Sequence, residues 1–278
     1  MKLTYFGTAA AEGMPALFCN CPYCKEARAR GGKNIRTRSQ ALVNDDLLID
    51  FPADTYLHFL QNGVEGDKIR HLLITHSHAD HFYPEQLELR KSPFAHEMRE
   101  KTMTVYCGEG TFEKLKTAPL ADSVTYKKMI AYQPQKIGNY TVIPLPANHN
   151  PGDGAFIYVI RDAEGTSLLY AHDTGYFFEE VFQYIEREKL YFNCISYDCT
   201  NVDIPSSHKN SHMSIDNILE ASRRLAEMGA RDANTTEILN HFSHNAKPLQ
   251  HILENRVKDY GWLIAFDGMQ VRISNQKN

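Results

Sequence analysis

The sequence has little of what membrane proteins and nucleic-acid-binding proteins need. Its apolar runs all fall well short of the roughly 18 residues that a membrane-spanning helix requires. Lysine and arginine number 30 against 34 aspartate and glutamate residues, so the net charge of −4 provides no general basic surface for nucleic acid. Repeats, low-complexity tracts and linker-like runs are also missing. We therefore expect one domain over residues 1–278, without membrane binding or extended nucleic-acid binding.

Two further absences concern the N-terminus. Residues 1–8 alternate like a strand and lack the continuous apolar core of a secretory signal peptide. Residues 7–13 lack the Gly-x-Gly spacing and the following lysine of a phosphate-binding loop. The first absence makes the cytoplasm the expected location, and the second indicates an ordinary loop.

One loop is rich in side chains that bind metals. The apolar run 72–74 predicts a buried strand, and the loop after it contains His76, His78, Asp80 and His81. His76 and His78 are two residues apart, so in an extended chain their rings point the same way and can hold one ion. Asp80 and His81 can face a second ion once the chain turns. Imidazole and carboxylate groups without a thiolate predict zinc, manganese or iron.

Three later residues share this setting, a polar side chain just past a predicted strand. They are His149 after residues 140–145, Asp173 after residues 168–170, and His241 after residues 236–239. Two catalytic ions about 3.5–4 Å apart need a ligand that contacts both, and a carboxylate can do so through its two oxygens. Asp173 is therefore the natural shared ligand. His172 points to the other face of its strand, so we expect it to pack outside the site.

The cysteines divide into one cluster and three isolated residues. Cys19, Cys21 and Cys24 lie close together, and in a cytosolic chain such clustering favours a metal over a disulfide. Three thiolates need a fourth ligand to complete a tetrahedral zinc site, and the alternative is a loop of reduced cysteines. The isolated residues are expected in the core: Cys107, Cys194 and Cys199.

The order of predicted elements is strands, a helix and strands again, twice over. This order is typical of two β-sheets flanked by helices. Strands are expected at 41–43, 47–50, 103–107, 140–145, 156–160, 168–170, 192–197 and 236–239, helices at 56–62, 178–189 and 215–228, and a final hairpin at 262–266 and 269–273.

The H-x-H-x-D-H pattern of residues 76–81, directly after a strand, resembles the signature of the metallo-β-lactamase superfamily. The resemblance covers nearly the whole chain and implies an α/β fold, an αββα sandwich of two mixed β-sheets flanked by helices. It also implies two ligand sets that share Asp173. One ion takes His76, His78, His149 and Asp173, and the other takes Asp80, His81, Asp173 and His241.

His212 stands just before a predicted helix, where a helix-flanking histidine is the ordinary interpretation. The phosphodiesterase branch of the superfamily, which includes ribonuclease Z, carries a similar histidine that is thought to protonate the leaving alkoxide. The resemblance thus implies a metal-dependent phosphodiesterase in which a metal-bridged hydroxide attacks phosphorus, with His212 as general acid. Asp80 and His212 are the candidate catalytic residues. Ribonuclease Z itself is disfavoured, because no long basic, glycine-rich insertion is present to clamp tRNA.

A narrower resemblance rests on the Gly7-Thr8 opening, the early cysteines, Asp198-Cys199 and residues 241–244. These features look like the phosphoribosyl cyclic phosphate phosphodiesterases of phosphonate catabolism, which carry an extra structural zinc. The resemblance implies that His244 is the fourth ligand beside Cys19, Cys21 and Cys24. The pyrroloquinoline-quinone biosynthesis B proteins share the early cysteine pattern but depart from the H-x-H-x-D-H motif, which this chain keeps whole.

Several alternatives stay open from the sequence. The substrate is expected to be a small cyclic phosphate or nucleotide-like phosphodiester, but its identity is not determined. A thioester or lactam hydrolase of the same superfamily and a non-catalytic cofactor-biosynthesis protein are the other functions. The native metal, the oligomeric state (a homodimer included) and a place in phosphonate metabolism are also open.

Overall fold

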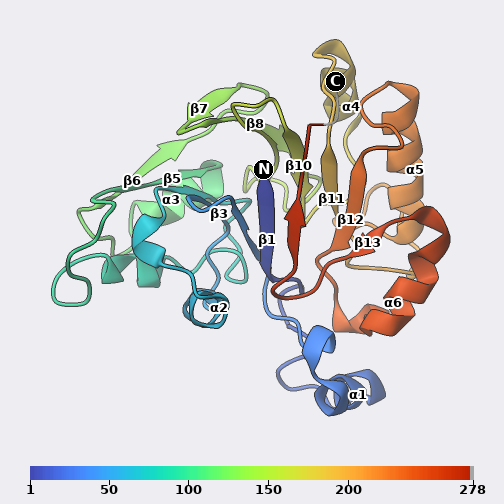
Figure 1. Ribbon diagram of the computed structural model, residues 1–278, viewed down its shortest axis with the longest axis horizontal. Coiled ribbons are helices and arrows are strands. Elements are labelled where there is room, and N and C mark those ends of the chain that lie inside the picture. Colours follow the sequence, from blue (N-terminus) through green and yellow to red (C-terminus); the bar gives the residue numbers. More distant parts are fainter. Residues whose placement is uncertain (276–278) are drawn as a thin grey trace.

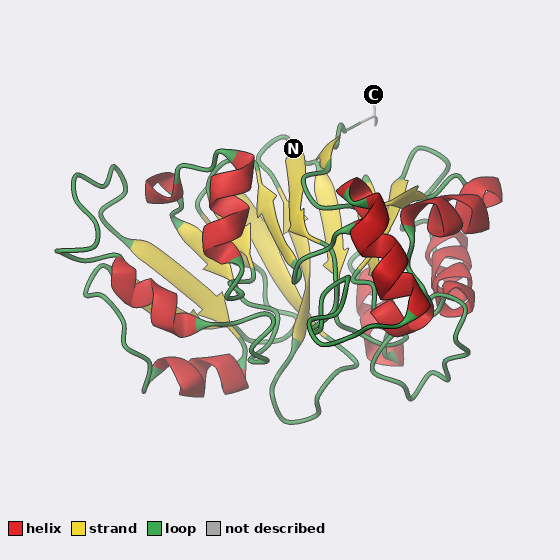
Figure 2. Ribbon diagram, turned by 90° about the horizontal axis from the view of Figure 1, so that it is seen from below, coloured by secondary structure: helices red, strands yellow, loops and turns green. Residues whose placement is uncertain are grey.

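The computed structural model describes residues 1–275, which form two seven-stranded β-sheets packed face to face (Figure 1). Helices α2 (Thr55–Asn62) and α3 (Glu109–Leu115) lie beside the first sheet, at the left of the figure. Helices α4 (Glu179–Arg187), α5 (Ile215–Glu227) and α6 (Gln250–Val257) lie beside the second sheet, at the right. Figure 2 shows the strands between these two groups of helices. The expected αββα sandwich is confirmed.

The first sheet has the order β14-β1-β2-β3-β4-β5-β6, with the N-terminal strand next to the edge strand β14. The pairs from β3 to β6 are parallel, and the other pairs are antiparallel, so the sheet is mixed. Its strands are β1 (Lys2–Gly7), β2 (Gln40–Val43), β3 (Leu47–Ile49), β4 (His71–Leu73), β5 (Met103–Cys107), β6 (Val124–Lys128) and β14 (Gln270–Arg272).

The second sheet is also mixed and has the order β13-β12-β11-β10-β9-β8-β7. Its pairs from β10 to β13 are parallel, and those from β7 to β10 are antiparallel. Its strands are β7 (Gln135–Ile137), β8 (Tyr140–Pro146), β9 (Phe156–Arg161), β10 (Ser167–Ala171), β11 (Cys194–Asp198), β12 (Thr236–Asn240) and β13 (Leu263–Ile264).

Apolar side chains fill the space between the sheets and beneath the helices. Leu3, Leu73 and Ile238 belong to the buried cluster that includes strands of both sheets. The central strands β10 and β11 are buried along their whole length, as expected of strands covered on both faces. Helix α5 begins with a capping box between Ser214 and Asn217, which satisfies backbone groups of its first turn.

Two hydrogen bonds join the sheets directly at the start of the histidine loop. The hydroxyl of Tyr158 on β9 donates to the Ile74 carbonyl at 2.6 Å, and the Phe156 amide donates to the Thr75 carbonyl at 2.8 Å. Because these carbonyls directly precede His76, the second sheet positions the loop that leaves the first sheet. Among residues 1–275, no helix has the length and apolar character needed to cross a membrane.

The expected C-terminal hairpin is wrong. Strand β13 pairs with β12 in the second sheet, whereas β14 pairs with β1 in the first. The turn between them instead crosses from one sheet to the other. It is held there because the Asp267 carboxylate accepts hydrogen bonds from Thr8 and Thr37, while the Gly268 amide donates to the Tyr5 carbonyl.

Candidate metal centre

Polar residues gather where strands of both sheets end. Three of them, each within two residues of the end of a strand, have left-handed backbone conformations: Asp50 (φ 64°), Asp173 (φ 54°) and His241 (φ 61°). Such conformations are unfavourable for residues other than glycine and persist where the surrounding structure enforces them. Each turns the chain sharply at the end of its strand. The clustering of three such residues at one edge points to a functional site.

The first group of ligand atoms surrounds one side of Asp173. Nε2 of His76 lies 3.1 Å from Asp173 Oδ2 and 2.9 Å from Nδ1 of His78. Nε2 of His149 lies 3.2 Å from the same His78 nitrogen, and its Nδ1 lies 3.4 Å from Asp173 Oδ1. The four residues offer ligand atoms that all lie within 4.8 Å of one another. They could therefore hold one metal ion.

The second group lies on the other side of the same carboxylate. Nε2 of His81 is 3.1 Å from Asp173 Oδ2, 3.4 Å from Asp80 Oδ2 and 3.2 Å from Nε2 of His241. These four residues also offer ligand atoms within 4.8 Å of one another. Asp173 belongs to both groups, which is the arrangement that a shared ligand requires.

At His76, His149 and Asp173, burial and mutual interaction favour the protonation states that bind metals. Burial alone would raise the pKa of Asp173, but His241 and His76 outweigh it and hold that pKa well below its usual value. Burial lowers the pKa of His149 to about 4, against the opposing effect of Asp173. It also lowers the pKa of His76. An ionised carboxylate beside neutral imidazoles is the form in which these groups bind a cation.

The donor set fits divalent cations. Burial would lower the pKa of His81, but the carboxylates of Asp50 and Asp80 outweigh it and raise that pKa well above 6.5. The carboxylates of Asp50 and Asp80 thus favour a positive charge at the position of His81. Oδ1 of Asp173 is buried and accepts no hydrogen bond within the described part of the chain. A cation between the histidines would supply that charge and could bind this oxygen, whose other contacts are ion pairs with His149 and His212.

A further layer of residues orients the histidine rings. Oδ2 of Asp50 lies 2.7 Å from Nδ1 of His81, the ring nitrogen that faces away from Asp173. Oγ1 of Thr200 lies 2.8 Å from Nδ1 of His241. Such partners fix the tautomer and orientation of metal-binding imidazoles. Sequence reasoning assigned no role to Asp50, although it directly follows an apolar strand, as the predicted ligands do.

His212 lies between two carboxylates at the edge of the metal groups. Its Nδ1 is 3.1 Å from Asp173 Oδ1 and 3.3 Å from Asp198 Oδ2, and 27% of its side chain is exposed. Burial would lower its pKa, but Asp198 and, to a lesser degree, Asp173 outweigh it and raise the pKa to about 9. Its Nε2 has no hydrogen-bond partner among residues 1–275. His212 can therefore present a proton on this nitrogen.

A pocket of about 370 Å³ opens onto these residues. Its volume is at the small end for ligand sites in proteins, which favours a small substrate over an extended polymer. It is lined by Ala10, Ala11, Glu12, His78, Asp80, His149, Asp173, Thr200, Asn201, His212, His241, Ser243 and Asn245. His208 lies outside this set and pairs with Glu220 on the surface.

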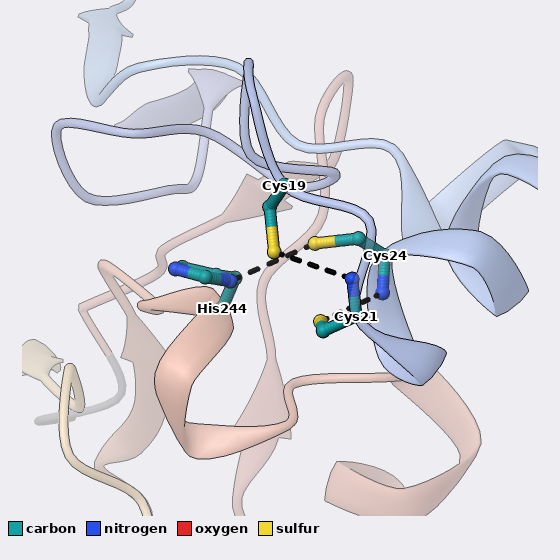
Figure 3. Close-up of side chains that lie close together, drawn as sticks. All are labelled: Cys19, Cys21, Cys24 and His244. Carbon is teal, nitrogen blue, oxygen red and sulfur yellow. Dashed lines mark hydrogen bonds between the residues drawn. The ribbon is translucent and has the colours of Figure 1, made fainter.

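The N-terminal cysteines lie beside the pocket. Figure 3 shows their side chains gathered with His244, which follows β12, and Cys24 Sγ is 3.6 Å from His244 Nδ1. Cys24 lies in helix α1 (Pro22–Arg30), and its backbone N–H donates to Cys21 Sγ at 3.4 Å, the main reason that the Cys21 pKa falls to about 6. Burial raises the Cys24 pKa to about 11. The ligand atoms of these cysteines and His244 lie within 4.8 Å of one another and could bind a structural zinc.

The structure thus brings together every residue of the two predicted histidine and aspartate groups and of the cysteine cluster. Their roles as ligands remain predictions. Cys107, Cys194 and Cys199 are buried, as expected. His172 is buried outside the metal groups, where its Nε2 lies 2.6 Å from the Ser196 hydroxyl.

Comparisons with known proteins agree with this fold. A family model described as the beta-lactamase superfamily domain matches residues 48–236, more than half of the chain. The crystal structure of a diphosphatase from the PhnP family superposes with a TM-score of 0.73 at 21% identity, covering 98% of each chain. Zn²⁺-bound PqqB from Methylobacterium extorquens has a TM-score of 0.73 at 18% identity, covering 98% of this chain and 100% of that one.

A third solved structure, the short form of human tRNase Z, has a TM-score of 0.66 at 14% identity and covers 99% of this chain and 100% of that one. A comparison with curated proteins finds no match. At these identities the solved structures support the fold alone.

Proposed function

The chain belongs to the metallo-β-lactamase superfamily, and on that premise we propose that it is a metal-dependent phosphodiesterase that acts on a small phosphodiester. Divalent ions held by the two histidine and aspartate groups would neutralise phosphoryl oxygens and lower the pKa of a bound water. Zinc, manganese and iron all suit these donors. The ligands in this proposal are His76, His78, Asp80, His81, His149, Asp173 and His241.

The position of His212 is the observation that carries the proposal. Its Nδ1 faces Asp173 and Asp198, which leaves Nε2 as the nitrogen that can deliver a proton to a leaving group. A phosphodiester with an alkyl or sugar leaving group needs this proton, because a free alkoxide is strongly basic. The pocket of about 370 Å³ also suits a small substrate, and His212 lines it together with ligand residues of both metal groups.

The dependence of rate on the leaving group tests this role. The variant His212→Asn should lose roughly 10²–10⁴-fold in kcat on a phosphodiester with an alkyl leaving group, the usual contribution of a general acid. Bis(p-nitrophenyl) phosphate should lose far less, because p-nitrophenolate departs without a proton. Both rates should be measured with zinc, manganese and iron.

The matched control is His251→Asn, which changes an exposed histidine of α6 that does not line the pocket. It should leave both rates within about twofold of the wild type. An equal loss on both substrates in His212→Asn would contradict the general-acid role. Hydrolysis of thioesters or lactams without any phosphodiesterase activity would overturn the proposed function itself.

A further inference from the structure

The pocket carries a carboxylate that the proposed chemistry does not use. Glu12 lies in the loop after β1 and lines the same pocket as His212. We propose that Glu12 selects the non-reacting part of the substrate, favouring a hydroxyl-bearing sugar or polyol and rejecting a second phosphate. This inference rests on the proposed function, because it concerns what the same pocket holds beyond the reacting phosphoryl group.

Glu12 is held in place through one of its two carboxylate oxygens. Oε1 accepts a hydrogen bond from the Ser243 hydroxyl at 2.6 Å and another from the His244 amide at 3.1 Å. Oε2 takes part in no hydrogen bond or ion pair among residues 1–275. The side chain is 30% exposed. Glu12 therefore offers one free acceptor oxygen from a fixed position. Its side chain loses little conformational entropy when a substrate donates a hydrogen bond to it.

The cysteine cluster strengthens this anchoring. His244 contributes its ring to the cluster shown in Figure 3, while its backbone amide donates to Glu12. Ser243, the other donor to Glu12, directly precedes it and is 8% exposed. Ser243 and His244, the two residues that donate to Glu12, are thus connected to Cys24 through the ring of His244. Such support outside the site is what holds a recognition group in one position.

The charges around the pocket decide which substrates can bind. None of the residues that line it is a lysine or an arginine. Arg38 binds the nearby Ala11 carbonyl, but its guanidinium is paired with Asp54 and does not line the pocket. Beyond the two metal groups and His212, whose Nδ1 faces the Asp173 and Asp198 carboxylates, the wall consists of Glu12 with neutral groups: Ala10, Ala11, Thr200, Asn201, Ser243 and Asn245.

This wall suits hydroxyl groups and opposes a second anion. Sugar hydroxyls can donate to the Glu12 carboxylate and exchange hydrogen bonds with the Asn201 and Asn245 side-chain amides. A second phosphate would meet the Glu12 charge with no lysine or arginine to offset it, because His212 already pairs with Asp173 and Asp198. Like charges brought together cost binding energy. The geometry therefore points to small phosphodiesters with an unphosphorylated sugar or polyol.

Equilibrium binding to the metal-loaded protein tests this preference without requiring turnover. Glucose 1-phosphate and glucose 1,6-bisphosphate share one phosphate and differ at a single position, so their Kd values can be compared by titration calorimetry. The wild type should bind the monophosphate at least about tenfold more tightly. In Glu12→Gln this ratio should approach one, because glutamine keeps the Oε1 acceptor for Ser243 and His244 but removes the charge.

Two further variants sharpen the test. Asn245→Asp adds a negative charge to the same wall and should increase the ratio further, which provides a readout if Glu12→Gln folds poorly. Glu26→Gln removes a charge from α1 outside the pocket, where Glu26 pairs with Arg30, and should leave the ratio unchanged. Zinc content and circular dichroism should match the wild type in each variant.

Two results would overturn the inference: a wild-type ratio near or below one, or a ratio that Glu12→Gln leaves unchanged. Failure of the proposed function looks different. A protein that hydrolyses no phosphodiester but keeps the charge-dependent affinity ratio loses the function and keeps the inference. A phosphodiesterase without that ratio loses the inference alone.

Discussion

Histidines in this protein differ in what lies beside them, and this difference decides their charge. His212, which is partly buried, contacts two carboxylates that together outweigh the effect of burial and raise its pKa to about 9. His58 is fully buried, and its ring nitrogens meet the neutral side chains of Gln40 and Thr37 at 2.7 Å each. Burial lowers its pKa to about 4, with Asp54 opposing. His58 therefore packs as a neutral residue, and its contribution to stability depends on pH.

The pH dependence of unfolding tests this assignment. The pKa of His58 falls from 6.5 to about 4 on folding, so the unfolded chain binds the proton first as the pH decreases. The contribution of neutral His58 to the free energy of unfolding is fully present above pH 6.5. It is lost as the pH falls from 6.5 towards 4, and it does not change further below about pH 4. The free energy of unfolding should decrease by about 3 kcal/mol in total, because each pH unit between the two pKa values corresponds to about 1.4 kcal/mol. Denaturant unfolding at several pH values measures it.

The difference between the wild type and His58→Gln isolates this group from others that titrate in the same range. Asp267, for example, has its pKa raised to about 6 by burial, so its effect has the opposite sign, and it is present in both proteins. The free energy of unfolding of His58→Gln should vary less between pH 6.5 and pH 4. Parallel curves for the two proteins would show that His58 is not buried in its neutral form.

At the scale of elements, local patterns identified most strands but not their partners. The strands that lead into the site were predictable, because each is a run of apolar residues followed by a polar ligand type. The strand that pairs with β14 could not be predicted, because the Asp267-Gly268 turn signal is local. The hydrogen bonds that position this turn come from Thr8 and Thr37, which are distant in the sequence. Strand β6 was missed because it is an edge strand with exposed threonine and lysine residues and little apolar alternation.

In the candidate site too, features set by local sequence patterns could be predicted, and features set by distant contacts could not. Its ligand groups could be predicted because motif and strand context coincide, and the narrower resemblance to the phosphoribosyl cyclic phosphate phosphodiesterases placed His244 with the cysteines. Asp198 was noted in the sequence, but its contacts with His212 and His241 depend on how β11 and β12 pair, which no local pattern states. Glu12 could not be predicted, because its position depends on a loop and on the segment after β12.

Helix α1 rests on few buried apolar side chains. It packs on a small apolar cluster whose buried residues are Met14, Ala16, Cys24, Ala27 and Leu249. So few buried side chains contribute little hydrophobic stabilisation, and small units of this kind are usually reinforced by a metal or disulfide. We therefore expect the bound zinc to hold α1 to the segment after β12.

The variant Cys21→Ser tests this role. It should lower the zinc content by about one ion per chain and lower the Tm, with roughly 2–4 °C lost for each 1 kcal/mol. Turnover of the folded protein should stay close to normal, because a closed four-ligand site leaves no position for substrate. The control Cys107→Ala removes a buried cysteine of β5 and should lower the Tm without changing the zinc content. Unchanged zinc in Cys21→Ser or in His244→Ala would contradict the assignment.

At the scale of the whole molecule, the candidate metal centre joins the two sheets. His76 and His81 follow β4 in the first sheet, whereas His149, Asp173 and His241 follow β8, β10 and β12 in the second. Bound ions would therefore connect the sheets at the edge where the Tyr158 and Phe156 hydrogen bonds already join them. Metal binding should then stabilise the entire sandwich as well as serve catalysis.

Asp173 is where this connection should be most sensitive, since it alone belongs to both ligand groups. Asparagine can adopt the left-handed backbone conformation of Asp173, so Asp173→Asn removes the charged ligand without straining the chain. Metal occupancy should therefore fall in both ligand groups. Activity should fall by more than ~100-fold, beyond the roughly 10–100-fold typical of losing an outer partner. His149→Ala removes a ligand of one ion only and should retain more activity. Metal analysis together with the metal-dependent shift in Tm distinguishes the two variants, and one fully bound, active ion in Asp173→Asn would show that this carboxylate does not bridge.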